Sequence, residues 1–193
     1  ARDAEVQDLV LGERRAREVA IESVLHERFE GLAVRDTPAH DVRRAEDRQL
    51  LLDAVLAASG RRTPSLEAII DAFTHPLLDR SARGGPGWKS YFALIAEVNN
   101  SREFGGVLMT RHFDPVVQRF IEAMRRALPG CDERDLFWAY HFLSGALTLT
   151  FAETGRIDKL SGGVCRSSDL DSVHQRLVPY CAAGFFFQAE DGI

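Results

Sequence analysis

The spacing of apolar residues constrains this chain most, because such residues recur every three or four positions along most of its length. Val116, Phe120, Met124 and Leu128 follow one another at four-residue steps, which places them on one face of a helix. The same periodicity predicts further helices over residues 17–29, 43–59, 65–80, 88–98, 132–154 and 169–184. No alternating strand pattern is sustained in the sequence. The chain is therefore expected to fold as an all-α protein.

Residues that favour helix starts and stops delimit the predicted segments. Thr63 and Pro64 suit the start of one helix, and Asp132 is placed to cap another. Glycine and proline within residues 81–87 break the pattern between two segments. Pro179 lacks the amide hydrogen that a helix interior needs, so we expect it to kink the last helix.

The composition is that of a folded protein without a membrane span. Hydrophobic residues make up 45% of the 193 positions and charged residues 27%, which argues against disorder. With a net charge of -5, only a local basic patch could attract nucleic acid. No run of about 18 apolar residues occurs, so no membrane partner is expected. The three cysteines share no close spacing, which is typical of free thiols in a reducing cytoplasm.

The sequence lacks the usual motifs for catalysis and metal binding. The six histidines are scattered without a paired histidine or cysteine nearby, so no metal site is predicted. Ser144 has no glycine two residues before it, as a nucleophile elbow requires. Residues 84–90 partly match a phosphate-binding loop, but Trp88 interrupts the match and a flexible interhelical linker explains them better. We expect no enzymatic activity, no catalytic residues and no cofactor.

Aromatic residues are concentrated in the predicted helices between residues 88 and 142. Such side chains usually fill a helical core, and a buried histidine is more often a core residue than a ligand contact. The alternative is an apolar cavity between helices that holds a few polar groups. We predict such a cavity, bounded by residues 88–98, 104–113, 116–128 and 137–151. The candidate ligand-binding residues are Trp88, Tyr91, Phe92, Phe104, Phe113, Phe120, Phe137, Tyr140 and His141.

Three stretches stand in an order and spacing that together are specific: residues 110–120 (TRHFDPVVQRF), 127–130 (ALPG) and 138–147 (WAYHFLSGAL). With residues 64–73, 176–178 and 182–184, they resemble the C-terminal regulatory domain of TetR-family transcriptional repressors. The resemblance covers about residues 43–184. It implies a homodimer in which a helical ligand-binding domain follows an N-terminal helix-turn-helix domain. It also implies that the last two long helices pair with those of a partner as a four-helix bundle.

The last two predicted helices, about residues 132–154 and 169–184, carry residues suited to such a dimer contact. Ser144, Gly145 and Ala146 are small enough for another helix to approach closely. Apolar neighbours supply area for an interface. We expect the interface to contain Leu143, Ser144, Leu147, Phe151, Val173 and Leu177.

The N-terminal residues depart from the family pattern. Residues 1–6 are similar to the segment before a recognition helix, and residues 11–14 to the turn after it. Only residues 7–10 lie between them, about one helical turn where roughly two are needed. We therefore expect a truncated or degraded helix-turn-helix that does not bind operator DNA in this chain as given. Arg14 is the best candidate for a phosphate contact, although a solvated charge at a helix start explains it better.

The sequence thus predicts three regions. Residues 1–30 are a remnant of the helix-turn-helix and its linker helix, and residues 31–184 form the ligand-binding and dimerisation domain. Phe185–Ile193 ends in QAEDGI, which resembles a translated sequencing adapter, so we expect a non-native tail there. The resemblance implies a cytoplasmic repressor whose intact form releases operator DNA when an unidentified small apolar molecule binds. The alternative is a helical dimerisation or ligand-binding module with no DNA-binding role.

Overall fold

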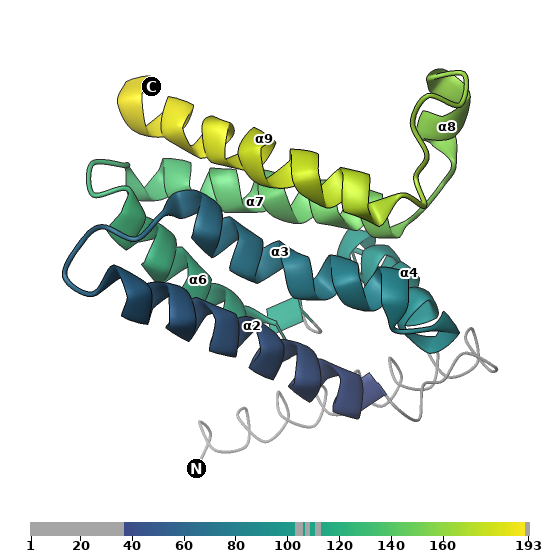
Figure 1. Cartoon of the computed structure of the whole chain (residues 1–193), viewed down its shortest axis with the longest axis horizontal. Coiled ribbons are helices and arrows are strands. Elements are labelled where there is room, and N and C mark those ends of the chain that lie inside the picture. Colours follow the sequence, from purple (N-terminus) through teal and green to yellow (C-terminus); the bar gives the residue numbers. More distant parts are fainter. Residues whose placement is uncertain (1–36, 103–105, 107–108, 111–112, 192–193) are drawn as a thin grey trace, which may run out of the picture. The chain divides into compact units, whose positions relative to one another are not determined.

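Helices make up most of the computed structural model, which describes residues 37–102, 106, 109–110 and 113–191 (Figure 1). No strand occurs among these residues, so the expected all-α fold is confirmed. The chain divides into two compact units, Ala1–Thr37 and Pro38–Ile193, and nearly all of the described residues belong to the second. The helices are α2 (Thr37–Ser59), α3 (Leu66–Arg83), α4 (Pro86–Asn100), α6 (Asp114–Ala127), α7 (Glu133–Phe151), α8 (Arg156–Leu160) and α9 (Leu170–Asp191).

Short polar side chains cap the starts of α3 and α7. The Ser65 hydroxyl accepts a hydrogen bond from the Ala68 amide at 3.2 Å, and the Asp132 carboxylate accepts one from the Arg134 amide at 2.8 Å. These bonds satisfy amide groups that have no partner within the first helical turn. The prediction for Asp132 is confirmed. The one for Thr63 is wrong, because Ser65, two residues later, is the side chain that reaches the amide of the first turn.

Two helices continue past an internal proline. Pro76 lies within α3 and Pro179 within α9. A proline removes one backbone hydrogen bond from a helix. In α9, Leu177 before the proline and Cys181 after it are both buried, so packing holds the helix on either side of Pro179.

One hydrophobic core holds these helices together. Helix α3 packs against α4, α6 and α9, while α7 packs against α4, α6 and α9, and α2 contributes the buried Leu52. Full burial of one such large apolar side chain stabilises the fold by roughly 1.5–3 kcal/mol. The largest fully buried apolar side chains are Phe92, Phe120, Phe185, Leu52, Ile69, Ile70, Ile121, Met124, Leu136 and Leu143.

Ion pairs join α2 to its neighbours. Arg80 of α3 contacts Asp47 at 3.0 Å, and Arg119 of α6 contacts Asp53 at 2.6 Å. Exposed pairs of this kind contribute little to stability, typically about 0–1 kcal/mol each. Together with Leu52 they fix which face of α2 is turned to the core, and therefore the position of Arg48 one turn earlier.

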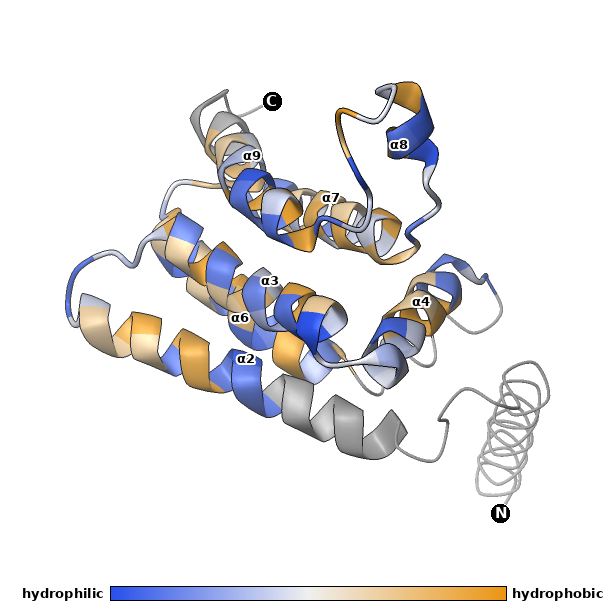
Figure 2. Ribbon diagram, turned by 45° about the vertical axis from the view of Figure 1, so that its right-hand side comes forward, coloured by the Kyte–Doolittle hydropathy of each residue, from blue (hydrophilic) through white to orange (hydrophobic). Residues whose placement is uncertain are grey.

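Helix α8 differs from the others because none of its residues is buried. It stands away from the remaining helices and mixes hydrophilic with hydrophobic residues (Figure 2). Within the described residues, no helix combines the length and the hydropathy that crossing a membrane requires.

The end of α9 includes the first residues of the predicted tail. Phe185 is buried in the core, and Phe186 is partly exposed. The helix continues without a break at residue 184. The non-native origin of residues 185–193 stays a prediction.

Candidate functional site: a pocket between the helices

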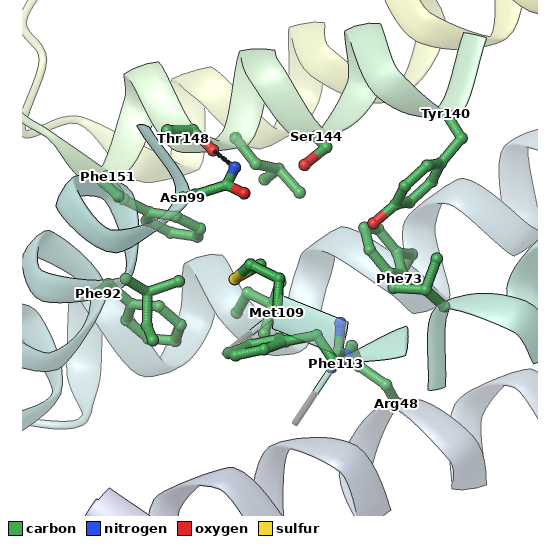
Figure 3. A pocket seen from close by; sticks show the side chains of 15 residues that line it. Arg48, Phe73, Phe92, Asn99, Met109, Phe113, Tyr140, Ser144, Thr148 and Phe151 are labelled. Atoms are coloured by element: carbon green, nitrogen blue, oxygen red, sulfur yellow. Dashed lines mark hydrogen bonds between the residues drawn. The ribbon is translucent and has the colours of Figure 1, made fainter. Parts of the chain in front are cut away.

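A pocket lies between five helices of the core (Figure 3). Its walls come from α2, α3, α4, α6 and α7, together with Met109 and Phe113. This is the region where the sequence predicts a cavity, with α2 and α3 as additional walls. The lining residues are Arg48, Phe73, Leu77, Phe92, Ile95, Ala96, Asn99, Met109, Phe113, Val117, Tyr140, Ser144, Leu147, Thr148 and Phe151.

Aromatic rings form much of the apolar wall. Phe92 of α4 and Phe151 of α7 stack with their centroids 4.6 Å apart and their planes at 19°. Phe73 of α3 meets Tyr140 edge to face at 6.1 Å. Ring pairs of this geometry contribute about 0.5–1.5 kcal/mol beyond the area they bury. The wall is therefore stiff where α4 meets α7.

Polar groups interrupt the apolar lining at two places. Near Phe92, the Asn99 amide donates a hydrogen bond to the Thr148 hydroxyl at 2.8 Å. Further along α7, the hydroxyl groups of Tyr140 and Ser144 lie on the pocket side (Figure 3). An apolar pocket with a few placed polar groups is the usual form of a small-molecule site.

A buried positive charge lies near the Tyr140 and Ser144 hydroxyl groups. Arg48 of α2 is only 3% exposed, and its guanidinium carbon lies 5.0 Å from the centroid of the Phe73 ring. A guanidinium over an aromatic face is attracted by the ring quadrupole. Burial raises the pKa of Tyr140, against the opposing effects of Ser144 and of the Arg48 charge. The phenol therefore keeps its proton at neutral pH and is able to donate a hydrogen bond into the pocket.

The pocket is small in this structure. About 50 Å³ is open to water-sized molecules. One water needs roughly 10–15 Å³ by this measure, so the space holds a few waters, whereas pockets for drug-sized ligands measure roughly 300–1,000 Å³. A ligand of that size would have to displace side chains. Met109 lines the pocket and, being unbranched, is the most adaptable of them.

The predicted ligand-binding residues fall into three groups. Phe92, Phe113 and Tyr140 line the pocket, and their contact with a ligand stays a prediction. A second group, Trp88, Tyr91 and Phe120, is buried in the core behind the lining. Phe137 and His141 are exposed on the outside of α7, away from the pocket, and Phe104 lies outside the described residues.

The predicted dimer residues lie mostly inside the chain's own core. Leu143, Leu147, Phe151 and Leu177 are buried, and Leu147 and Phe151 line the pocket together with Ser144. Burial against the chain's own helices leaves these side chains almost no exposed area to offer to a partner. Val173 is half-buried. The DNA-contact candidate Arg14 lies outside the described residues.

A different set of apolar side chains is exposed on α7. We use the name outer face for Phe137, Trp138, His141 and Phe142, all of which are exposed. The Trp138 and Phe142 rings stack at 6.0 Å, and Trp138 meets His141 edge to face at 5.5 Å. Tyr180 and Phe186 add exposed aromatic rings on the neighbouring helix α9.

Three residues that line the pocket were not predicted from the sequence: Arg48, Asn99 and Thr148. For Arg48 a signal was present, because it precedes the buried Leu52 by four residues and so continues the apolar stripe of α2. Charged residues are rarely buried, so a charged residue at a position that faces the core is a candidate for a polar contact inside the protein. Asn99 and Thr148 carry no comparable signal, since their pairing joins residues 49 positions apart.

The described residues thus form an all-α domain with a small, mainly apolar pocket between its helices. A family model described as tetracyclin repressor-like, C-terminal domain, matches residues 71–184, which is more than half of the chain. The chain therefore belongs to this family and contains a TetR-type regulatory domain. Members of the family are generally not enzymes. A comparison with curated proteins gave no match.

Proposed function

We propose that this chain is the ligand-sensing and dimerisation part of a ligand-responsive TetR-type repressor. The observation that carries the proposal is the pocket, because all of its lining residues except Arg48 lie within the matched residues 71–184 and because it combines aromatic walls with a few polar groups. In the intact protein, a small molecule that binds one conformation better shifts the population toward it and releases operator DNA.

The lining indicates what kind of molecule fits. An apolar body would lie against Phe92, Leu147 and Phe151, and one hydrogen-bond acceptor would face the hydroxyl groups of Tyr140 and Ser144. Apolar contact supplies most of the binding free energy in such sites, and the polar groups fix orientation. We therefore propose a small, mainly apolar ligand with a single polar end.

Helix α7 supplies a physical link between the pocket and a dimer. It lines the pocket through Tyr140, Ser144 and Leu147, and it also carries the exposed side chains of the outer face. We propose that the outer face, with exposed residues of α9, contacts a second copy of the chain. A ligand that enlarges the pocket would displace α7 and change how the two copies meet.

A thermal-shift screen with small apolar molecules tests ligand binding. A compound at about one hundred times its Kd should raise Tm by about 5–10 °C for a chain of this size. The informative pair of variants is Leu147→Phe and Leu149→Phe, because Leu147 lines the pocket and Leu149, on the same helix, is exposed. Leu147→Phe fills part of the cavity and should abolish the shift, whereas Leu149→Phe should retain it.

Two results would contradict the proposal. One is a screen in which no apolar compound stabilises the chain. The other is a stabilising compound whose effect is the same in Leu147→Phe as in the unmodified chain, because such a compound binds elsewhere. Each variant is compared with its own ligand-free Tm, which removes the cost of overpacking, about 1–3 kcal/mol, from the comparison.

A further inference from the structure

Three side chains of the kind that binds metal ions meet where α9 packs on α3. Asp71 and His75 come from α3, and His174 comes from α9. An Asp71 carboxylate oxygen, Oδ1, lies 2.6 Å from Nε2 of His174 and 3.8 Å from Nδ1 of His75. One potential ligand atom from each residue lies within 4.8 Å of the others.

The backbone places these residues together in a defined way. Asp71 and His75 are four residues apart, so they lie one turn apart on the same face of α3. His174 is one turn beyond the buried Leu170 and three residues before the buried Leu177, so α9 packing holds it against α3. The two imidazole rings meet edge to face with centroids 4.6 Å apart. All three side chains therefore project from helices that the core fixes.

The distances suit a tetrahedral zinc ion. Zinc bonds to histidine nitrogen and carboxylate oxygen are about 2.0–2.2 Å long, so tetrahedral neighbours lie roughly 3.3–3.5 Å from each other. The two observed separations, 2.6 Å and 3.8 Å, lie on either side of this value. Side-chain rotations that move the ligand atoms by less than about 1 Å would bring the three atoms to the distances of a tetrahedral zinc site. Two histidines and one carboxylate also form a common three-ligand set that leaves a fourth position for water.

The surroundings favour a cation and leave room for it. A hollow of about 160 Å³ adjoins the cluster and is lined by His75, His174, Asp79, Arg83 and Asp171, with Leu78 and Leu170. Arg83 donates to both Asp79 and Asp171 at 2.6 Å, so its positive charge is compensated. With neutral histidines, three carboxylates face one guanidinium, and the excess negative charge attracts a positive ion.

We propose that Asp71, His75 and His174 bind one divalent transition-metal ion of the zinc type. The ion would fasten the first turns of α9 to α3. No sequence motif indicates this site, because 103 residues separate Asp71 from His174 and the contact between α3 and α9 brings them together. The proposal is independent of the ligand pocket, since none of the three residues lines that pocket.

Calorimetric titration of the purified, chelator-treated full chain with zinc chloride at about pH 7.5 tests the site. We expect one zinc ion per chain. His75→Ala and His174→Ala should each weaken binding by about 100-fold or more, since each removes a direct ligand and loss of even an outer-shell partner costs 10–100-fold. Cys165→Ala is the matched control, because Cys165 is an exposed side chain of a type that can bind zinc and belongs to neither the cluster nor the pocket; this variant should bind zinc as the unmodified chain does.

Cobalt(II) in place of zinc gives a second readout, because its visible spectrum distinguishes tetrahedral from octahedral coordination. We expect a tetrahedral spectrum that both alanine variants lose. Equal zinc affinity in His75→Ala and the unmodified chain overturns the proposal, as does an absence of zinc binding or an octahedral cobalt spectrum. If His174→Ala fails to fold by circular dichroism, His75→Ala decides the matter, since His75 is half-exposed and its removal leaves the bond between Asp71 and His174 intact.

Discussion

The cysteine thiols of this domain differ in burial, and therefore in their reactivity. Cys181 lies in the core between α9 and its neighbours, and this burial raises the pKa of its thiol to about 11. Burial also raises the pKa of Cys131, with a smaller contribution from the negative charges of Asp135 and Asp132. Cys165 is exposed. Since the thiolate is the reactive form, alkylating reagents should modify Cys165 before Cys181.

The raised pKa of Cys181 predicts a loss of stability at high pH. The unfolded chain releases this proton near pH 9, whereas the folded chain keeps it up to about pH 11. The contribution is therefore complete below pH 9 and is lost as pH rises through this window, by at most about 3 kcal/mol for a rise of about two pKa units. Urea unfolding at about pH 8 and pH 10.5 measures this loss of free energy of unfolding. Cys181→Ala should lose less free energy of unfolding over this interval than the unmodified chain.

Cys165→Ala serves as the control for this comparison, because it removes a thiol that is exposed in the folded chain. It should lose as much free energy of unfolding with pH as the unmodified chain does. A Cys181→Ala variant that matches Cys165→Ala at both pH values would show that burial of the Cys181 thiol has no effect on stability.

At the scale of helices, α6 and α7 differ in how well their sequences predict which side of the helix faces the core. In α6 the apolar residues occupy one face, so Val116, Phe120 and Met124 are buried where the periodicity predicts. Helix α7 is apolar on both sides, with Leu136 and Leu143 buried and Trp138 and Phe142 exposed. Periodicity identifies such a helix without indicating which side faces the core.

This ambiguity explains why some of the site residues predicted on α7 do not line the pocket in the structure. His141 and Tyr140 are adjacent in sequence, yet a rotation of about 100° between successive helical residues places Tyr140 in the pocket and His141 outside. The same rotation places Leu143 and Leu147 in the core and leaves Phe142 exposed. The sequence alone predicted the longer helices and the region of the pocket, but it did not predict the short helix α8. The assignment of α7 side chains required the packing partners.

The outer face of α7 predicts a dimer that a double substitution dissociates. Exposed aromatic clusters on a protein surface usually mark an interface. We expect the chain to sediment as a dimer at tens of micromolar and Trp138→Arg with Phe142→Arg to sediment as a monomer. Because both side chains are exposed, the free energy of unfolding of the monomer should change by less than about 1 kcal/mol.

The matched control is Ile157→Arg with Leu160→Arg, which places the same charges at exposed apolar positions of α8. This control should remain dimeric. A monomeric unmodified chain would contradict the dimer proposal, and dissociation by the α8 substitutions to the same extent would contradict the role of the outer face.

In the molecule as a whole, the two proposed binding sites and the outer face share a small set of helices. Helix α7 contributes side chains to both the pocket and the outer face, and α9 packs against α7 while holding His174 against α3. Packed helices shift as units rather than deforming continuously. A ligand that moves α7 would therefore also move the surfaces through which two copies of the chain meet.

A crystal structure of the chain with the most stabilising compound from the screen tests this account most directly. We predict that the compound lies between Phe92 and Tyr140, with its polar end at the Tyr140 and Ser144 hydroxyl groups. The cavity should then exceed the present volume of about 50 Å³, and α7 should be displaced relative to α4. A compound bound on the outer face or beside α8, with the pocket unchanged, would contradict the account.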